Sequence, residues 1–279
     1  MARATLTQSG GGVQPHLSFA GLVRQFPDGV RALDDVSFDV PKGQFCVVLG
    51  RSGSGKTTLL RSVNGLTELD GGTVRLNDTE MARGTLRAIR RRVAMVHQQF
   101  NLVERASVAA NVLSGAVAEV SGWRVHLGWY PETLRARACA ALHRVGLDEI
   151  HLNRRAAALS GGQQQRVGIA RALLLNPEVI LADEPVASLD PAISREILTL
   201  LRDVARERGA TVLCSLHQTD LAREFADRIV GMRSGRVVFD GPSARFDAAA
   251  EAALYENTPA VVSPKAPATL ERSYGCTPL

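Results

Sequence analysis

Short apolar runs separated by turn residues dominate the first hundred residues of the chain and return after residue 177. Runs of four or five apolar residues have the length of buried strands and are too short for helices. These runs lie at 45–49, 93–96 and 179–182, and 211–215, with Val212, Leu213 and Cys214 at its centre, is also a predicted strand. The last two predicted strands alternate with segments of helical pattern at 194–208 and 220–227. Strand, helix, strand at this spacing predicts a parallel sheet covered by helices.

Two other patterns accompany this predicted core. From 17 to 40, short apolar segments alternate with turns such as Pro27-Asp28-Gly29, which predicts two or three strands, and 71–77 predicts a hairpin. Between about 99 and 166 the pattern is helical, with alanine-rich stretches such as 138–142. We therefore expect an α/β fold with an antiparallel β subdomain and an inserted α-helical subdomain.

The expected domain boundaries follow from these changes of pattern. We expect a flexible leader at 1–14, which contains three consecutive glycines, and a loose tail at 258–279, where prolines occur without periodicity. The folded domain then spans 15–257, with its core at about 15–98 and 167–257 and the helical subdomain at about 99–166.

Composition excludes several classes of protein. With 279 residues, 45% hydrophobic and 22% charged, this is the composition of an ordinary folded chain. No run of 18 apolar residues occurs, so we expect no membrane-spanning helix. The four cysteines form no C-x-x-C pair, which argues against a disulfide framework or zinc site and fits a reducing cytoplasm. The net charge of +5 comes almost wholly from arginine, and we interpret it as composition bias that needs no nucleic-acid partner.

A glycine-rich turn between a predicted strand and a predicted helix carries the clearest chemistry. Residues 50–57 read GRSGSGKT and match G-x-x-x-x-G-K-[ST]. Glycines let the backbone approach phosphates closely, and successive N–H groups form an anion nest at the start of the helix. Lys56 would supply charge to the β- and γ-phosphates, and Thr57 a hydroxyl to Mg²⁺. We therefore expect ATP or GTP to bind Gly50, Arg51, Ser52, Gly53, Ser54, Gly55, Lys56, Thr57 and Thr58.

Further motifs separate the nucleotide-binding families. In chain order these are Gln98, Leu159-Ser160-Gly161-Gly162-Gln163, Asp183-Glu184, Ala187-Ser188-Leu189-Asp190 and Ser215-Leu216-His217. By their order and spacing, the chain resembles the ATP-binding cassette family from about Leu17 to Gly241. The resemblance implies a P-loop NTPase fold with a RecA-like core.

The resemblance also implies a role for each motif. Glu184 would be the general base or would orient the attacking water, and His217 would hold the γ-phosphate. Thr57, Gln98 and Asp183 would hold Mg²⁺.

Other roles concern the adenine base and a second chain. Phe26 would stack on adenine. Two chains would form a head-to-tail homodimer with two ATP molecules between them. Ser160, Gly161 and Gly162 of one chain would cap the γ-phosphate bound to the other, and Gln163 and Asp190 are also expected at the nucleotide.

Within the family, the chain resembles the ATPases of phosphonate importers. The similar segments lie at 98–103, 123–130, 181–191, 215–224 and 227–231. This resemblance implies a peripheral ATPase at the cytoplasmic face of the cell membrane that couples ATP hydrolysis to uptake of phosphonates or a related phosphorus oxyanion. Its partners would be integral membrane permease subunits and a periplasmic or extracellular substrate-binding protein.

Two alternatives and one departure accompany this interpretation. The chain could serve an importer for another small solute, such as phosphate or amino acids, or be a soluble cassette ATPase that acts on nucleic acid or the ribosome. His97 stands before Gln98, where the phosphonate branch usually has an aromatic residue. A locally hydrogen-bonded histidine and a pH-sensing one are both compatible with this position.

Overall fold

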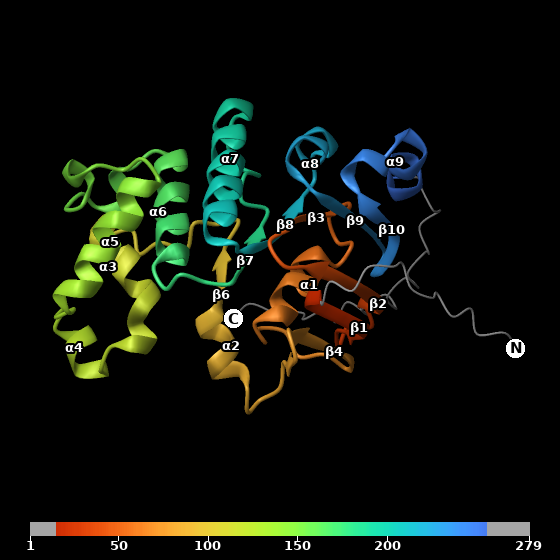
Figure 1. Ribbon diagram of the computed structural model, residues 1–279, viewed down its shortest axis with the longest axis horizontal. Helices are drawn as coiled ribbons and strands as arrows, with labels where there is room; N and C mark the ends of the chain where they lie inside the picture. Colours follow the sequence, from red (N-terminus) through yellow and green to blue (C-terminus); the bar gives the residue numbers. More distant parts are fainter. Residues whose placement is uncertain (1–14, 256–279) are drawn as a thin grey trace, which may run out of the picture.

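A six-stranded sheet forms the centre of the fold (Figure 1). The computed structural model describes residues 15–255, so the expected leader at 1–14 and tail at 258–279 lie outside the described residues. The strand order is β10-β9-β3-β8-β7-β6, and all neighbours are parallel except β10 and β9. The strands are β3 (Phe45–Leu49), β6 (Val93–Val96), β7 (Val179–Asp183), β8 (Thr211–Leu216), β9 (Arg228–Arg233) and β10 (Arg236–Pro242).

A four-stranded antiparallel sheet lies beside this core, with the order β2-β1-β4-β5. Its strands are β1 (Pro15–Gln25), β2 (Arg31–Pro41), β4 (Gly71–Leu76) and β5 (Thr79–Glu80). Phe19 of β1 and Phe38 of β2 are register partners whose rings stack with centroids 4.4 Å apart. The buried His16 ties this sheet to the core, because its Nδ1 lies 2.6 Å from Oγ1 of Thr211 on β8.

The helices divide between the two faces of the central sheet and a separate layer at one end of the molecule. Figure 1 places α3 to α6 together in that end layer, beyond α7. The α-helices are α1 (Lys56–Val63), α2 (Leu86–Arg92), α3 (Val108–Leu113), α4 (Gly122–His126), α5 (Glu132–Arg144), α6 (Gly161–Leu173), α7 (Pro191–Arg208), α8 (Thr219–Phe225) and α9 (Ala248–Tyr255). Short 3₁₀ helices occupy Ser114–Glu119, Glu149–His151, Ala156–Ala158 and Ser243–Arg245. Between residues 15 and 255 no helix is both long and apolar enough to cross a bilayer.

Two hydrophobic cores pack against the two faces of the central sheet. Val47 and Leu49 of β3 belong to the core shared with α7, α8 and the helical layer. Cys46 and Val48 belong to the core shared with α1 and the antiparallel sheet. Because successive side chains of a strand point to opposite faces, a strand covered on both sides must be apolar throughout. This explains the unbroken apolar run of β3, and why β7 and β8 are apolar except at Asp183, Thr211 and Ser215.

The α4 end of the helical layer carries the two tryptophans of the chain, Trp123 and Trp129. Their rings meet edge to face, with centroids 5.9 Å apart, and both side chains are more than half exposed. The guanidinium of Arg124 lies 5.3 Å and 5.5 Å from the two ring centroids, within range of a cation–π contact. The aromatic segment expected at 123–130 is therefore a surface feature far from the central sheet (Figure 1).

Candidate functional site

The glycine-rich turn connects β3 to α1, and its glycines are required by close backbone contacts. A side chain at Gly50 would overlap the carbonyl oxygen of Met232, and one at Gly55 would overlap that of Ala32. Gly53 and Gly55 also have φ angles of 79° and 102°, which disfavour other residues. Gly55 is the N-cap of α1 and offers no side chain to the first N–H groups of that helix. An uncapped helix N-terminus of this kind suits an anion such as a phosphate.

Lys56 brings a buried cation to the same place. Its side chain is 3% exposed, and Nζ donates to the carbonyl oxygens of Gly50 at 2.8 Å and Arg51 at 3.1 Å. Burial lowers the pKa of Lys56, and the nearby carboxylate of Glu184 opposes that change. Nζ lies 3.6 Å from Oε1 of Glu184, so the ammonium group is partly neutralised by a partner that a phosphate could replace.

The carboxylate of Asp183, at the end of β7, contacts the first helical turn after the glycine-rich turn. Oγ1 of Thr57 donates to Oδ1 of Asp183 at 2.9 Å. Hydroxyl and carboxylate oxygens are the donors that Mg²⁺ prefers, and Mg²⁺ typically uses one or two carboxylates together with substrate phosphates. Residues 15–255 contain no cluster of three or more histidine, cysteine or acidic side chains that could hold a metal without such help. The donor set therefore fits Mg²⁺ bound together with a nucleotide.

Glu184 and His217 form a second close contact in the site. Nε2 of His217 lies 2.6 Å from Oε1 of Glu184, and Nδ1 lies 3.4 Å from Nζ of Lys56 and 3.2 Å from the carbonyl oxygen of Gly50. Because the ammonium group can only donate, the contact with Lys56 requires Nδ1 as acceptor, whereas the contact with the Gly50 carbonyl oxygen requires it as donor. Glu184 itself has a φ of +47°, an uncommon backbone conformation for a residue with a side chain.

A cavity of about 350 Å³ joins these groups to the antiparallel sheet. It is lined by Phe26, Val30, Ala32, Ser52, Gly53, Gly55, Lys56, Thr57, Thr58, Gln98 and Glu184. Phe26 is 36% exposed, and the guanidinium of Arg24 lies 5.1 Å from its ring centroid. The cavity thus has an aromatic ring and the phosphate-binding turn in its walls, as an adenine nucleotide requires. Gln98 is exposed and reaches the cavity from the segment after β6.

Five further candidate residues lie at the starts of α6 and α7 and do not line this cavity. Ser160 and Gln163 form a reciprocal cap at the start of α6, with Ser160 Oγ 3.3 Å from the amide of Gln163 and Gln163 Oε1 3.0 Å from the amide of Ser160. Gly161 and Gly162 follow in the first turn of that helix. Asp190 caps α7, since its Oδ1 accepts from the amides of two residues in the first turn. Within one chain these residues therefore stabilise helix starts.

His97 is half-buried next to Gln98. Burial lowers its pKa, the charges of Arg171 and Arg61 lower it further, and Asp183 opposes them. Neither ring nitrogen of His97 has a hydrogen-bond partner among residues 15–255. Arg171 on α6 fixes the segment that follows, donating to the carbonyl oxygens of Phe100 at 3.0 Å and Asn101 at 2.6 Å.

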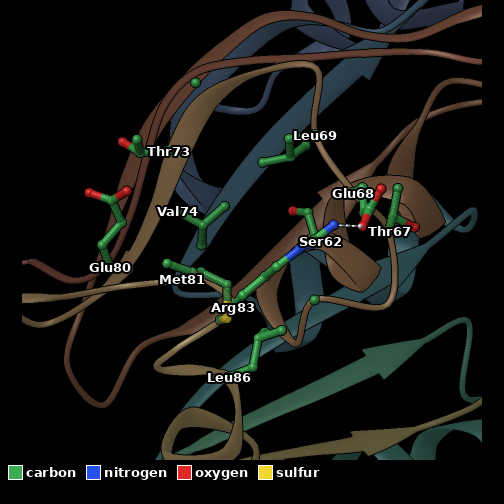
Figure 2. Close-up of a pocket in the computed structure, with 13 residues that line it drawn as sticks. Ser62, Thr67, Glu68, Leu69, Thr73, Val74, Glu80, Met81, Arg83 and Leu86 are labelled. Atoms are coloured by element: carbon green, nitrogen blue, oxygen red, sulfur yellow. Dashed lines mark hydrogen bonds and ion pairs between the residues drawn. The ribbon is translucent and has the colours of Figure 1, made fainter.

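A larger hollow of about 550 Å³ lies between β4, β5, α1 and α2 (Figure 2). Its walls include Leu69, Val74 and Met81, and an exposed ion pair between Arg83 and Glu68, 3.4 Å apart, lies at its edge. No candidate site residue lines it. Size alone therefore does not identify the nucleotide site, whereas the convergence of charged groups does.

Sequence reasoning assigned no role to Ser215. Its hydroxyl donates to Oδ1 of Asp183 at 3.0 Å and accepts from the amide of Glu184 at 2.9 Å. The only sequence signal was its place two residues before His217, which does not reveal a contact with a neighbouring strand.

Comparison with known proteins gives a consistent family. The pattern of the ABC transporter family matches residues 33–187, more than half of the chain. A phosphonates import ATP-binding protein of Hydrogenovibrio crunogenus is 50% identical over 240 residues, which cover 86% of this chain and 88% of that protein. A protein of the same name from Hyphomonas neptunium is 55% identical over 215 residues, or 77% of this chain and 82% of the relative.

Solved structures support the same assignment. An ATP-binding cassette in a dimeric post-hydrolysis state, bound to ADP and Pi, is 31% identical with a TM-score of 0.70, over 81% of this chain and 98% of that one. A component of the ABC transporter complex cbiONQ from Clostridium perfringens has a TM-score of 0.72 at 28% identity, over 87% and 96% of the two chains. The expected P-loop NTPase fold is therefore confirmed. The chain belongs to the ABC transporter family.

Proposed function

We propose that the chain is the ATP-hydrolysing subunit of an ABC importer that takes up phosphonates or a related phosphorus oxyanion. The observation that carries the ATPase part is the convergence of Lys56, Glu184 and His217 at the glycine-rich turn, with Thr57 and Asp183 beside them. The substrate class rests on relatives about 50% identical that are named phosphonates import ATP-binding proteins.

The chain's own residues would bind and orient the nucleotide. Phe26 would stack on adenine, while Lys56 and the N-terminus of α1 would hold the phosphates. Thr57, Asp183 and Gln98 would hold Mg²⁺, which when bound would neutralise charge on the β- and γ-phosphates. All of these except Asp183 line the same cavity, and Asp183 contacts it through Thr57.

Glu184 would activate the attacking water, and the geometry suggests what controls it. Oε1 of Glu184 is engaged by both His217 and Lys56. Phosphates at the turn would give Lys56 a stronger anionic partner and would free Glu184 to accept a hydrogen bond from water. His217, still within reach of Glu184, would orient that water toward the γ-phosphate.

The assembly would involve several partners. Two copies would pair head to tail, so that Ser160, Gly161, Gly162, Gln163 and Asp190 of one copy meet the nucleotide of the other; the dimeric state of the solved relative supports this arrangement. Integral membrane permease subunits and a substrate-binding protein would complete the importer. The ATPase would then be peripheral at the cytoplasmic face of the membrane.

Uptake in cells that lack the gene for this chain tests the substrate. Complementation should restore uptake of phosphonates, and the Lys56→Ala variant should not restore it. Unimpaired phosphonate uptake in the deletion strain would contradict the substrate class, and selective loss of phosphate or amino acid uptake would favour the alternative importers. ATP hydrolysis by the purified chain tests the enzymatic part separately.

A further inference from the structure

The hydroxyl of Ser215 on β8 joins the two consecutive acidic residues at the end of β7. We propose that Ser215 is a positioning residue for Mg²⁺-dependent ATP hydrolysis, acting through Asp183 and Glu184 without contacting the nucleotide. The proposal rests on the proposed ATPase function and adds to it a residue to which no role has been given.

Strand register brings these groups together. β7 and β8 are parallel neighbours, and Asp183 and Ser215 are register partners. The side chain of Ser215 is fully buried, and its one proton goes to Oδ1 of Asp183 at 3.0 Å. Its oxygen accepts the amide proton of Glu184 at 2.9 Å. A single buried hydroxyl therefore uses its donor and an acceptor position on two adjacent residues of the site.

The contact with Asp183 orients the carboxylate. Oδ1 of Asp183 accepts from Ser215 and from Thr57, and both bonds fall on this one oxygen. Among residues 15–255, Oδ2 receives no hydrogen bond, so it remains available to a cation or its water shell. Because Oδ1 is held by two hydrogen bonds, the carboxylate loses little conformational freedom when Oδ2 binds a metal.

The contact with Glu184 fixes the backbone at an unfavourable conformation. Glu184 has a φ of +47°, a region that residues with side chains rarely adopt unless surrounding contacts hold them there. The hydrogen bond from its amide to Oγ of Ser215 is such a contact. Without it, we expect the Glu184 carboxylate to lose its fixed position near His217 and the phosphate-binding turn.

The test compares variants of neighbouring buried positions on β8. Ser215→Ala removes both hydrogen bonds. Cys214→Ala is the matched control, because Cys214 is equally buried but belongs to the core on the opposite face of the sheet. Ser215→Thr keeps a hydroxyl at this position. Should Ser215→Ala not fold, Ser215→Cys carries the same expectation, since it keeps the size of the side chain with a weak donor.

Two measurements separate positioning from folding. For Ser215→Ala we expect kcat for ATP to fall about 10- to 100-fold and the Mg²⁺ concentration at half-maximal rate to rise about tenfold, as for other residues that orient metal ligands. A non-hydrolysable ATP analogue should bind in EDTA within about twofold of the unaltered chain, while the gain in affinity on adding Mg²⁺ should shrink, since the phosphate-binding turn is untouched. Ser215→Thr should keep most of the rate of the unaltered chain.

The outcomes distinguish this proposal from the proposed function. If Ser215→Ala keeps both its rate and its Mg²⁺ dependence, or if it loses analogue binding in EDTA in step with its thermal stability, positioning is overturned. If the unaltered chain in its assembled complex hydrolyses no ATP, the proposed function fails, and the Mg²⁺-dependent gain in analogue affinity still decides the role of Ser215.

Discussion

Replacing Glu184 with glutamine removes one negative charge and keeps the size of the side chain. Oε1 of Glu184 lies 2.6 Å from Nε2 of His217 and 3.6 Å from Nζ of Lys56. The side chains of Glu184 and Lys56 are 12% and 3% exposed, so water screens their attraction poorly. The substitution therefore acts on the chemistry of hydrolysis and on the stability of the nucleotide-free protein.

The size of the stability effect follows from the 3.6 Å separation. At an effective dielectric constant of about 20, two unit charges at this distance attract by about 4–5 kcal/mol. Desolvation offsets most of this, and Lys56 keeps its bonds to the carbonyl oxygens of Gly50 and Arg51. We expect Glu184→Gln to lower the free energy of unfolding by about 1–3 kcal/mol without nucleotide, and to lower the pKa of Lys56 further.

Bound nucleotide should reverse the sign of this penalty. The phosphates of ATP would neutralise Lys56 in place of Glu184, and the variant would also lack a carboxylate that repels them. We therefore expect equilibrium titration to give an ATP affinity higher than that of the unaltered chain. Phosphate release should fall by at least about 100-fold, since general base catalysis contributes on that scale.

Urea unfolding with and without saturating Mg²⁺ and ATP measures both effects. Glu196→Gln is the control, because Glu196 is 61% exposed on α7 and pairs with Arg166 at the surface. Phosphate release within a few-fold of the unaltered chain would refute the assignment of Glu184. An equal loss of stability in the presence and absence of nucleotide would refute the exchange of partners at Lys56.

Three further predictions concern stability. Burial lowers the pKa of His16 below 6.5 despite the opposing charge of Glu178, so the stability that His16 contributes should be lost as pH falls from 6.5 through its folded-state pKa. Urea midpoints at pH 8 and pH 5 should show this loss in the unaltered chain and a smaller loss in His16→Gln. Substitution of the exposed His126 by glutamine is the control. Gly53→Ala and Gly55→Ala both place a side chain at positive φ, but only the side chain at 55 would overlap backbone, at the carbonyl oxygen of Ala32. Gly55→Ala should therefore lower the free energy of unfolding in urea by about 1–3 kcal/mol more than Gly53→Ala. Equal losses of stability in the two variants would disprove the clash. Asp190→Ala should cost about 1 kcal/mol by removing the cap of α7, and Asp190→Asn much less, as thermal unfolding would show.

The buried strands could be predicted from the sequence because their environment imposes a local pattern. The segments 45–49 and 179–182 are apolar at every position, 211–215 is apolar except for Thr211 and Ser215, and the structure covers both faces of each. The glycine-rich turn was equally accessible, since close approach of the backbone restricts those positions to glycine. Strands β9 and β10 were not predicted; β10 in particular alternates exposed and half-buried residues at an edge of the sheet.

Contacts between distant segments left no local signal. The strand order places β3 between β8 and β9, which lie more than 160 residues further along the chain, and the hydrogen bonds of Ser215 depend on that order. The ends of the helices were also misplaced by the prediction from sequence. α7 begins at Pro191, three residues before the predicted start, and α6 continues through the expected subdomain boundary between 166 and 167. The caps that define these helix starts are residues that motif matching had given to the nucleotide.

Trp123 and Trp129 are the whole tryptophan content of the chain, and both are exposed side by side at α4. Intrinsic tryptophan emission consequently reports on one end of the helical layer. It does not report directly on the nucleotide cavity, which has no tryptophan in its lining. A spectral change on adding ATP or a membrane partner would mark an event at α4 without any label, and unfolding followed by tryptophan emission would report on the helical layer and not directly on the central sheet.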